Sequence, residues 1–547
     1  MKSIMGCFSL IILLPTLLIS HAYAEDLWTT VSSDHSIYPF LERMQNRGII
    51  SPIGEIRPVT RREIIDRIIH ISDRLEKIPD LLTDKERAQL SGFCIEFADE
   101  LPKKYRVETQ HARLRFNARQ IDGRLHPRRL FVYTKDANGL YISVLFNERI
   151  VSRAFNREYD DELVFRHGGG VICRGYIGDK LGFYIRAANY LEQGTYEYNP
   201  KEQNVLPNFA KISGDRMTYD KTDAYFGLNV SPIYIKFGKD RVEWGPGFNG
   251  KLSLSDNAGS FTHLALTTRI GPVLATHLTG FLNSRTTTLQ TDDQGNQWKE
   301  TVGKYLAGHR AEVTIKSRAV IGAQEIIIYG NRGLEAAYLN PFNFYRSAEH
   351  DLHDKDNASM QLDATVFPAK NWRIHAVWFI DDLYMGKFFD HVFNNKFGLQ
   401  AGFFYTGFPN IEIKAEYTRV DQWVYSHYLP INTFSHDDRI LGHWIGPDSD
   451  DLFFEISYDL LPELKTALTF ERIRSGDLSD FTIPYTERTT DSKRFLEGHV
   501  EREYRIGFHI DYEPFGETRA RINLNLNDLK NKDHIVGKDA ILICFVK

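Results

Sequence analysis

The 547-residue sequence has only four cysteines and no excess of positive charge. Cys94, Cys173 and Cys544 are too widely spaced for a disulfide framework or a zinc site, and we expect them to be apolar side chains of a core. The fourth, Cys7, falls in the N-terminal apolar segment. A formal net charge of −5 argues against nucleic acid as a partner.

Long apolar runs are missing after the N-terminus. Residues 1–24 carry a basic residue at Lys2, an apolar run from Phe8 to Ile19 and the small-residue end Ala22-Tyr23-Ala24, which predicts a secretory signal peptide. No later stretch offers the roughly 18 apolar residues that a membrane-spanning helix needs. If this exported protein lies in a membrane, it must therefore be a closed β-barrel, since only a barrel or helices satisfy the backbone there.

Residues 25–104 have a helical pattern and predict a small bundle that lies on the periplasmic side of a barrel or plugs it. The first helix places Ile37, Phe40, Leu41 and Met44 on one face. The next two follow capping boxes, Thr60-Arg-Arg-Glu63 and Thr83-Asp-Lys-Glu86. Each helix has one apolar stripe, so the three must pack on one another or on another part of the protein.

Residues 105–547 lose the helical period, and strand-like windows recur. Short and long connections alternate between these windows, and the short ones lie near 178–180, 231–232, 271–272, 317–318, 368–370, 408–410, 461–463 and 514–516. An outer-membrane barrel shows this asymmetry, with tight periplasmic turns and longer outer loops. We therefore expect an all-β transmembrane barrel of antiparallel strands, with a secreted propeller or sandwich as the alternative.

The lengths of the windows support a barrel. Residues 397–406, 411–420 and 311–315 alternate with a period of two, as expected when one face meets lipid and the other a polar lumen. We count roughly 20 windows, most of them near the ten residues that a tilted strand needs. The first two, around 107–117 and 128–135, are the weakest. Abundant aromatic residues, with 36 Phe, 27 Tyr and 7 Trp, suit pleated surfaces and membrane interfaces.

The densest chemistry lies in the connection that follows Gly238. Asp240, Arg241 and Glu243 could bind a sugar or an acidic polymer, and Trp244 offers a flat face for stacking. The alternative is an ion-pair network in the lumen, with Gly245 and Gly247 turning the chain.

Further along the same connection, Asn249 and Asn257 add donors and acceptors of the kind that a hydroxyl-rich ligand requires. We therefore predict a polysaccharide site at Asp240, Arg241, Glu243, Trp244, Asn249 and Asn257.

Two further connections carry polar chemistry. Residues 349–354, EHDLHD, are dense in potential metal ligands but match no zinc or calcium spacing, so we expect a polar outer loop and no metal site. Residues 421–451 form a long loop with aromatic residues and histidines that either gates the barrel or touches ligand. The sequence has no Gly-x-Ser-x-Gly elbow, no His-Glu-x-x-His helix and no phosphate loop, so we expect neither an enzyme nor a cofactor.

Several segments resemble the outer-membrane capsule-assembly (Wzi) family. The resemblance covers nearly all of the mature chain, and its most specific part is the Trp-Gly-Pro-Gly stretch within residues 237–250. Other segments that carry it are 254–257, 338–342, 379–382, 441–447 and 40–43. It implies a barrel of 18 strands, so that one early pair of our windows lies outside the barrel, and a helical bundle on the periplasmic side.

The same resemblance implies a surface lectin that attaches or organises capsular or exported polysaccharide in the outer membrane of a Gram-negative-type bacterium. Its partners would be the polysaccharide, outer-membrane lipid and the polysaccharide export machinery. The alternative is a diffusion porin, because residues 36–69 have the helix, loop and helix layout of a surface-layer-homology repeat. Conductance across a bilayer would separate the two hypotheses.

Overall fold

The computed structural model describes residues 27–106, 129–155, 162–194, 210–284, 287–291, 297–387, 393, 395–437, 439–488, 491, 493–515, 518–530 and 536–546. The predicted signal peptide, residues 1–24, and the first weak strand window, 107–117, lie outside this part of the chain.

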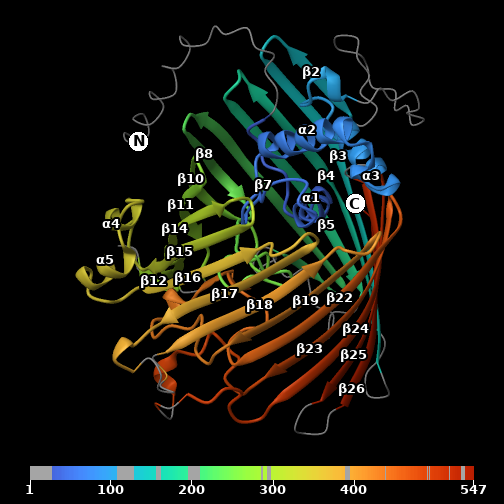
Figure 1. Ribbon diagram of the computed structural model, residues 1–547. Helices are drawn as coiled ribbons and strands as arrows, with labels where there is room; N and C mark the ends of the chain where they lie inside the picture. Colours follow the sequence, from blue (N-terminus) through green and yellow to red (C-terminus); the bar gives the residue numbers. More distant parts are fainter. Residues whose placement is uncertain are drawn as a thin grey trace.

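The described residues form a closed barrel of antiparallel strands (Figure 1). Eighteen strands make the ring in chain order, and β26 pairs with β3 to close it. They are β3 (Asn138–Phe155), β4 (Glu162–Ile177), β5 (Leu181–Gly194), β7 (Arg216–Val230), β8 (Ile233–Asp240), β10 (Phe261–Ile270), β11 (Val273–Leu282), β14 (Lys304–Ile315), β15 (Ala319–Gly330), β16 (Asn357–Val366), β17 (Trp372–Asp382), β18 (Lys396–Tyr405), β19 (Ile411–Val420), β22 (Ser449–Leu461), β23 (Leu464–Ser475), β24 (Glu501–Phe515), β25 (Thr518–Lys530) and β26 (Val536–Val546).

Short strands and helical turns complete the chain. β2 (Phe131–Lys135) pairs only with β3, and β6 (Lys211–Ser213) only with β7, so the second weak window is not a ring strand. The other elements outside the ring are β1 (Ile56–Arg57) with β9 (Glu243–Trp244), β12 (Thr287–Thr291) with β13 (Gln297–Thr301), β20 (Ser435–His436) with β21 (Arg439–Ile440), α4 (Ala336–Leu339), α5 (Tyr345–Asp351), η3 (Met385–Lys387), η4 (Pro430–Asn432) and η5 (Tyr485–Glu487).

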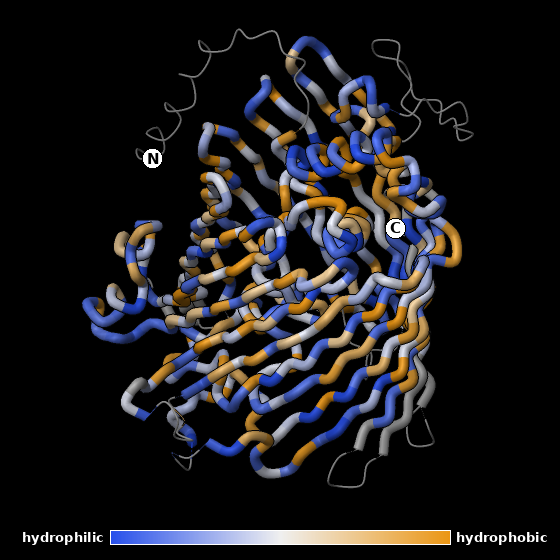
Figure 2. Tube along the Cα trace, viewed as in Figure 1, coloured by the Kyte–Doolittle hydropathy of each residue, from blue (hydrophilic) through white to orange (hydrophobic). Residues whose placement is uncertain are grey.

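The alternation predicted from the sequence is present along the wall. Figure 2 shows hydrophobic and hydrophilic residues following one another along the strands. On β16, for example, Leu362 is exposed on the outside, whereas its neighbours Gln361 and Asp363 are buried in the lumen. All the short connections that the structure describes join strands at one end of the barrel. By the rule for outer-membrane barrels, this end is periplasmic.

The N-terminal helices are α1 (Ile37–Asn46), α2 (Arg61–Lys77) and α3 (Asp84–Glu96), followed by the short turns η1 (Pro79–Leu81) and η2 (Lys103–Tyr105). The capping box at Thr83 and Glu86 forms as predicted. At Thr60 the hydroxyl accepts the Glu63 N–H, but the Glu63 carboxylate turns to Arg269 of β10, 3.1 Å away. None of the helices in the described part of the chain is long and apolar enough to cross a membrane.

The helical bundle lies at the end of the barrel that carries the short turns (Figure 1). Asn46 donates to the carbonyl oxygen of Asn371, and the Gln89 amide donates to that of Pro462, at 2.9 and 3.3 Å. The Trp28 indole donates to the carbonyl oxygen of Asp179 in another turn. The bundle therefore lies at the end with the short turns, and its own core is formed by the apolar stripes of α1, α2 and α3. Its periplasmic location stays a prediction.

Candidate functional site

The connection between β8 and β10, residues 241–260, folds into the barrel; we call it the lumen loop. Its strand β9 pairs antiparallel with β1 of the bundle, so that Trp244 lies opposite Ile56. The Trp244 side chain is only 1% exposed. It belongs to an apolar core inside the barrel, packed against the inner face of the wall from β10 to β19, together with Leu254, Leu278, Leu306, Ile326, Phe379 and other side chains. The lumen loop and the bundle therefore meet inside the barrel.

Glycines allow the lumen loop to make this turn. Gly245 has a φ of 115°, which side chains disfavour, and its N–H donates to the carbonyl oxygen of Glu55 in the bundle at 2.9 Å. A Cβ atom on Gly247 would lie 2.0 Å from the carbonyl oxygen of Gly250. Both glycines therefore let the chain turn and pack. This agrees with the alternative hypothesis, in which the loop forms an ion-pair network in the lumen.

The three predicted charged residues lie at the end of β8 and in the first part of the lumen loop. Asp240 accepts hydrogen bonds from Lys236 of the same strand and, at 3.3 Å, from the hydroxyl of Thr30. The Glu243 carboxylate is 3.6 Å from the ammonium of Lys251. The guanidinium of Arg241 is partly exposed and has no ion-pair or hydrogen-bond partner among the residues that the structure describes. Of the three, only Arg241 has a charge that is not already neutralised.

The two predicted asparagines have internal partners. The Asn249 amide donates to Asp451 of β22 at 2.9 Å, and the Asn249 N–H donates to Glu416 of β19 at 2.9 Å. The amide of Asn257 donates to the carbonyl oxygen of Ile440 at 2.9 Å. These bonds fix the lumen loop to the wall opposite β8 and to a second connection.

The six predicted residues therefore lie in one stretch, Asp240 at the end of β8 and the others in the lumen loop, but they contact different parts of the protein. Glu243 and Trp244 face the bundle, Asn249 faces the wall of β19 and β22, and Asn257 faces residues 421–448. Direct contact of these residues with sugar stays a prediction. For Trp244 such contact needs the loop to move, because the ring is covered on both faces.

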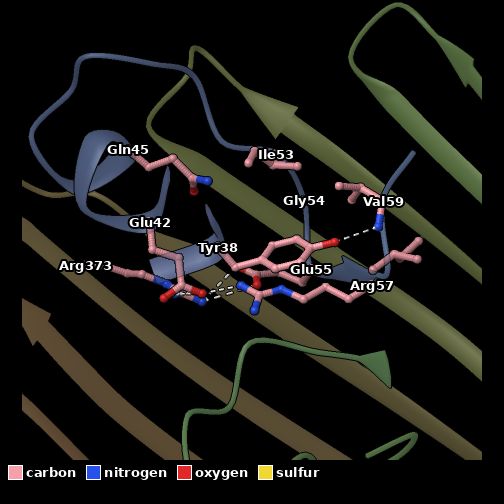
Figure 3. A pocket seen from close by; sticks show the side chains of 10 residues that line it. Tyr38, Glu42, Gln45, Ile53, Gly54, Glu55, Arg57, Val59 and Arg373 are labelled. Carbon is pink, nitrogen blue, oxygen red and sulfur yellow. Dashed lines mark hydrogen bonds and ion pairs between the residues drawn. The ribbon is translucent and has the colours of Figure 1, made fainter. Parts of the chain in front are cut away.

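A narrow crevice lies where the bundle enters the lumen (Figure 3). The carboxylate of Glu42 is hydrogen-bonded to Arg57, and Arg373 of β17 donates to Glu55 at 3.1 Å. Burial favours a raised pKa at Glu42, but the charges of Arg57, Arg373 and Lys414 outweigh it and lower the pKa to about 2. The crevice is thus occupied by paired ions of opposite sign.

Residues 421–448, the connection between β19 and β22, form a second plug in the lumen. The rings of Tyr425 and Phe434 stack with their centroids 5.6 Å apart, and the Tyr425 hydroxyl donates to the carbonyl oxygen of Leu252 in the lumen loop. His443 is fully buried, and burial lowers its pKa to about 4, so the imidazole is neutral at pH 7. In this structure the loop lies inside the barrel against the lumen loop, and its predicted role as a gate or ligand contact stays a prediction.

An aromatic and ionic surface lies on the outer connections, at the end opposite the bundle. The ring of Tyr428 is 4.4 Å from His427 and 6.1 Å from Tyr485, centroid to centroid. The ammonium of Lys396 lies 4.3 Å from the Tyr485 ring centroid, and Tyr384 on the neighbouring connection is 52% exposed. Sequence reasoning missed this group because its members come from three connections. The sequence feature that could have indicated this group is the presence of a tyrosine in each of the three long connections.

Metal-binding geometry is not found within the described ranges, where no three His, Cys, Asp or Glu side chains converge on one point. In the segment 349–354, Glu349 pairs with Arg346 at 2.9 Å, and His350 and Asp354 are exposed. Burial raises the pKa of Glu349 to about 7, despite the opposing charge of Arg346.

Comparison with known proteins adds a family match and several structural matches. A sequence model of the family described as capsule assembly protein Wzi matches residues 147–540. Wzi of Escherichia coli, described as an outer membrane protein involved in group 1 capsule assembly and as a carbohydrate-binding β-barrel, matches with a TM-score of 0.56 and 12% identity, covering 94% of this chain and 98% of that one.

Two Pseudomonas aeruginosa structures, OpdK with vanillate and OccK2 (OpdF) with glucuronate, match with TM-scores of 0.43 and 0.41 at 13% and 11% identity. Each match covers 74% of this chain and 97% of the other. The search of curated proteins found no match.

Proposed function

Because this chain belongs to the capsule assembly protein Wzi family, we propose that it is an outer-membrane lectin that attaches or organises capsular or exported polysaccharide at the cell surface. The protein acts by binding and not by catalysis. A repeating polymer presents the same sugar many times, so many weak contacts add up to firm attachment.

The observation that carries this proposal is the folded chain that lies inside the lumen. The apolar core around Trp244 covers the inner face of the wall from β10 to β19, and ion pairs join the bundle to the wall near the short turns. On the wall itself, the buried Arg310 donates to Asp363 at 2.7 and 2.8 Å. A diffusion porin needs a continuous water-filled path. The folded chain inside the lumen therefore favours binding at the outer rim over passage through the barrel.

The outer aromatic and ionic surface is the part best suited to sugar. Tyrosine rings such as Tyr428 and Tyr485 offer flat apolar faces to the C–H side of a sugar. The ammonium of Lys396 is buried beneath the Tyr485 ring and supports it from inside the barrel. In this proposal the lumen loop holds the rim in shape, and Arg241 is its member with a free charge for an acidic polymer. Asp240, Glu243, Trp244, Asn249 and Asn257 act mainly through their position.

Two further partners belong to the same proposal. The outward faces of the strands contact outer-membrane lipid, and the bundle presents a surface to the periplasm, where the export machinery delivers the polymer. A bundle held to the barrel by buried ion pairs is a fixed surface for such a contact.

The test is polymer retention by cells that produce the double variant Tyr428→Ala and Tyr485→Ala. We expect polysaccharide to be released into the medium, while the barrel keeps its heat-resistant migration on gels. Tyr133→Ala, on β2 at the periplasmic end, is the matched control and should retain polymer. Unchanged retention by a folded double variant, together with no binding of the purified protein to a sugar array, would contradict the proposal.

A further inference from the structure

The barrel wall at β14 and β15 separates two apolar cores. Ile326 and Ile328 of β15 point into the lumen and belong to the core around Trp244. Ile327 and Tyr329 alternate with these two residues along the strand. They point outward and belong to a different buried core. Side chains alternate across a strand, so a run that is apolar at every position must be covered on both faces. Something other than lipid therefore covers this part of the outer wall.

The cover is the connection between β15 and β16, residues 331–356, which we call the outer arm. Figure 1 shows its helices α4 and α5 standing beside the barrel next to β14–β16. Tyr338 and Tyr345 of the arm are fully buried against Ala307, Ile327 and Ala358 of the wall. The arm is fastened at its base, where Asp356 accepts from Arg332 at 2.8 Å and from the Tyr338 hydroxyl at 2.7 Å.

Polar groups of the wall lie beneath the outer arm. The Glu325 carboxylate accepts the N–H groups of Tyr345 and Arg346 at 2.8 and 2.7 Å, and the imidazole of His309 lies 3.4 Å from it. The Tyr345 hydroxyl lies 3.2 Å from Nδ1 of His277. On a lipid-facing wall a bare carboxylate is costly. The arm removes that cost by giving these outward groups protein partners.

The exposed side of the arm carries large apolar residues beside polar ones such as Asn340 and His350. Phe342 is 95% exposed, Phe344 55% and Leu339 43%. Toward the periplasm, the same outward face of the wall continues with the exposed aliphatic residues Val313, Ile321 and Leu362. This face is the lipid-contacting surface of the barrel, so the exposed residues of the arm continue an interface that already exists.

We propose that the outer arm is an interfacial membrane anchor, and that Leu339, Phe342 and Phe344 enter the outer leaflet beside the barrel wall. Aromatic side chains favour the boundary between headgroups and acyl chains. If the tip of the arm stayed in water, the apolar surface of these three side chains would remain exposed to solvent. The anchor is independent of the polysaccharide, since the arm reaches lipid from the wall and not from the rim of the lumen.

The test replaces Phe342 with a photo-crosslinking benzophenone amino acid in the full-length protein, reconstituted into vesicles of phosphatidylcholine and phosphatidylglycerol without polysaccharide. We expect lipid adducts at a yield comparable to that of the same probe at Leu362. The probe at Asp215, on the exposed tip of the β6–β7 hairpin, is the negative control and should give only background. A second probe at Phe344 guards against a local effect at one position.

Two results overturn the anchor. Background adducts at both Phe342 and Phe344, with Leu362 labelled, mean that the arm tip stays in water. Crosslinks from Phe342 to a second copy of the chain mean that the arm is a contact between subunits. Heat-resistant migration of each probe variant shows that it is folded, and polymer retention is not measured, so this test is separate from that of the lectin.

Discussion

The guanidinium of Arg373 lies 3.1 Å from the carboxylate of Glu55 and 3.2 Å from the carbonyl oxygen of Pro246. Arg373 belongs to the wall, Glu55 to the bundle and Pro246 to the lumen loop. One buried cation thus joins the three parts of the protein, and Thr365 adds a hydroxyl donor to the same carboxylate at 2.8 Å.

Replacing Arg373 with alanine should loosen the bundle. Removing one partner of a buried ion pair leaves an uncompensated charge and costs about 3–5 kcal/mol. We expect a lower midpoint of thermal unfolding in detergent and faster proteolysis of the bundle, with the barrel still resistant. Arg62→Ala, which breaks an exposed pair with Asp66 on α2, should cost no more than about 0.5 kcal/mol. Equal effects of the two variants would contradict this role for Arg373.

Trp244→Ala should destabilise the lumen core by about 3–5 kcal/mol, since a large buried ring is removed and a cavity remains. The measurement is the thermal midpoint followed by circular dichroism. Trp372→Ala, at a partly exposed ring on the outer wall, removes the same side chain with a smaller loss. If Trp244→Ala were as stable as wild type while sugar binding was lost, the ring would be a ligand contact rather than a packing residue.

The bundle–barrel contact should weaken only in strong acid. The pKa of Glu42 is lowered from 4.5 to about 2 in the folded protein, so its ionised form stabilises the fold above pH 4.5. This contribution is lost as the pH falls from about 4.5 through 2. Thermal midpoints measured between pH 6 and pH 2 should fall more steeply below pH 4.5 in wild type than in Glu42→Gln. Parallel curves would show that Glu42 does not carry the effect.

The folded chain inside the lumen predicts a silent barrel. Wild-type protein in a planar bilayer should show no steady ionic current, because bundle, lumen loop and residues 421–448 occupy the path. Shortening residues 243–257 to a Gly-Ser linker removes one of these plugs and should raise the conductance. A stable, ion-selective current through wild-type protein would favour the porin alternative.

The sequence predicts the barrel well because its signal is spread over many hairpins. Residues 411–420 match β19 at both ends, and the turn at Ser231-Pro232 joins β7 to β8 as expected. A strand is predicted from the alternation of apolar and polar residues alone, and every strand of a barrel wall has this alternation because its two faces meet different surroundings. The short window at 311–315 is the end of the longer β14, because the small and polar residues from Lys304 onward hide the alternation.

The candidate site was harder to predict. A glycine-rich loop with charges and Trp244 has the same composition whether it lines a ligand site or fills a lumen. Only the three-dimensional pairing of Trp244 with Ile56, some 190 positions away in the chain, distinguishes the two. Residues 349–354 predicted a polar loop, whereas the structure buries Tyr338 and Tyr345 of the outer arm against the wall. Their partners on β14 to β16 cannot be found by spacing alone.

The pairing of β9 with β1 has a mechanical consequence. The lumen loop starts and ends at the end of the barrel opposite the bundle, and inside the barrel it is hydrogen-bonded to the bundle. A load on the outer rim is therefore shared between the wall and this central brace.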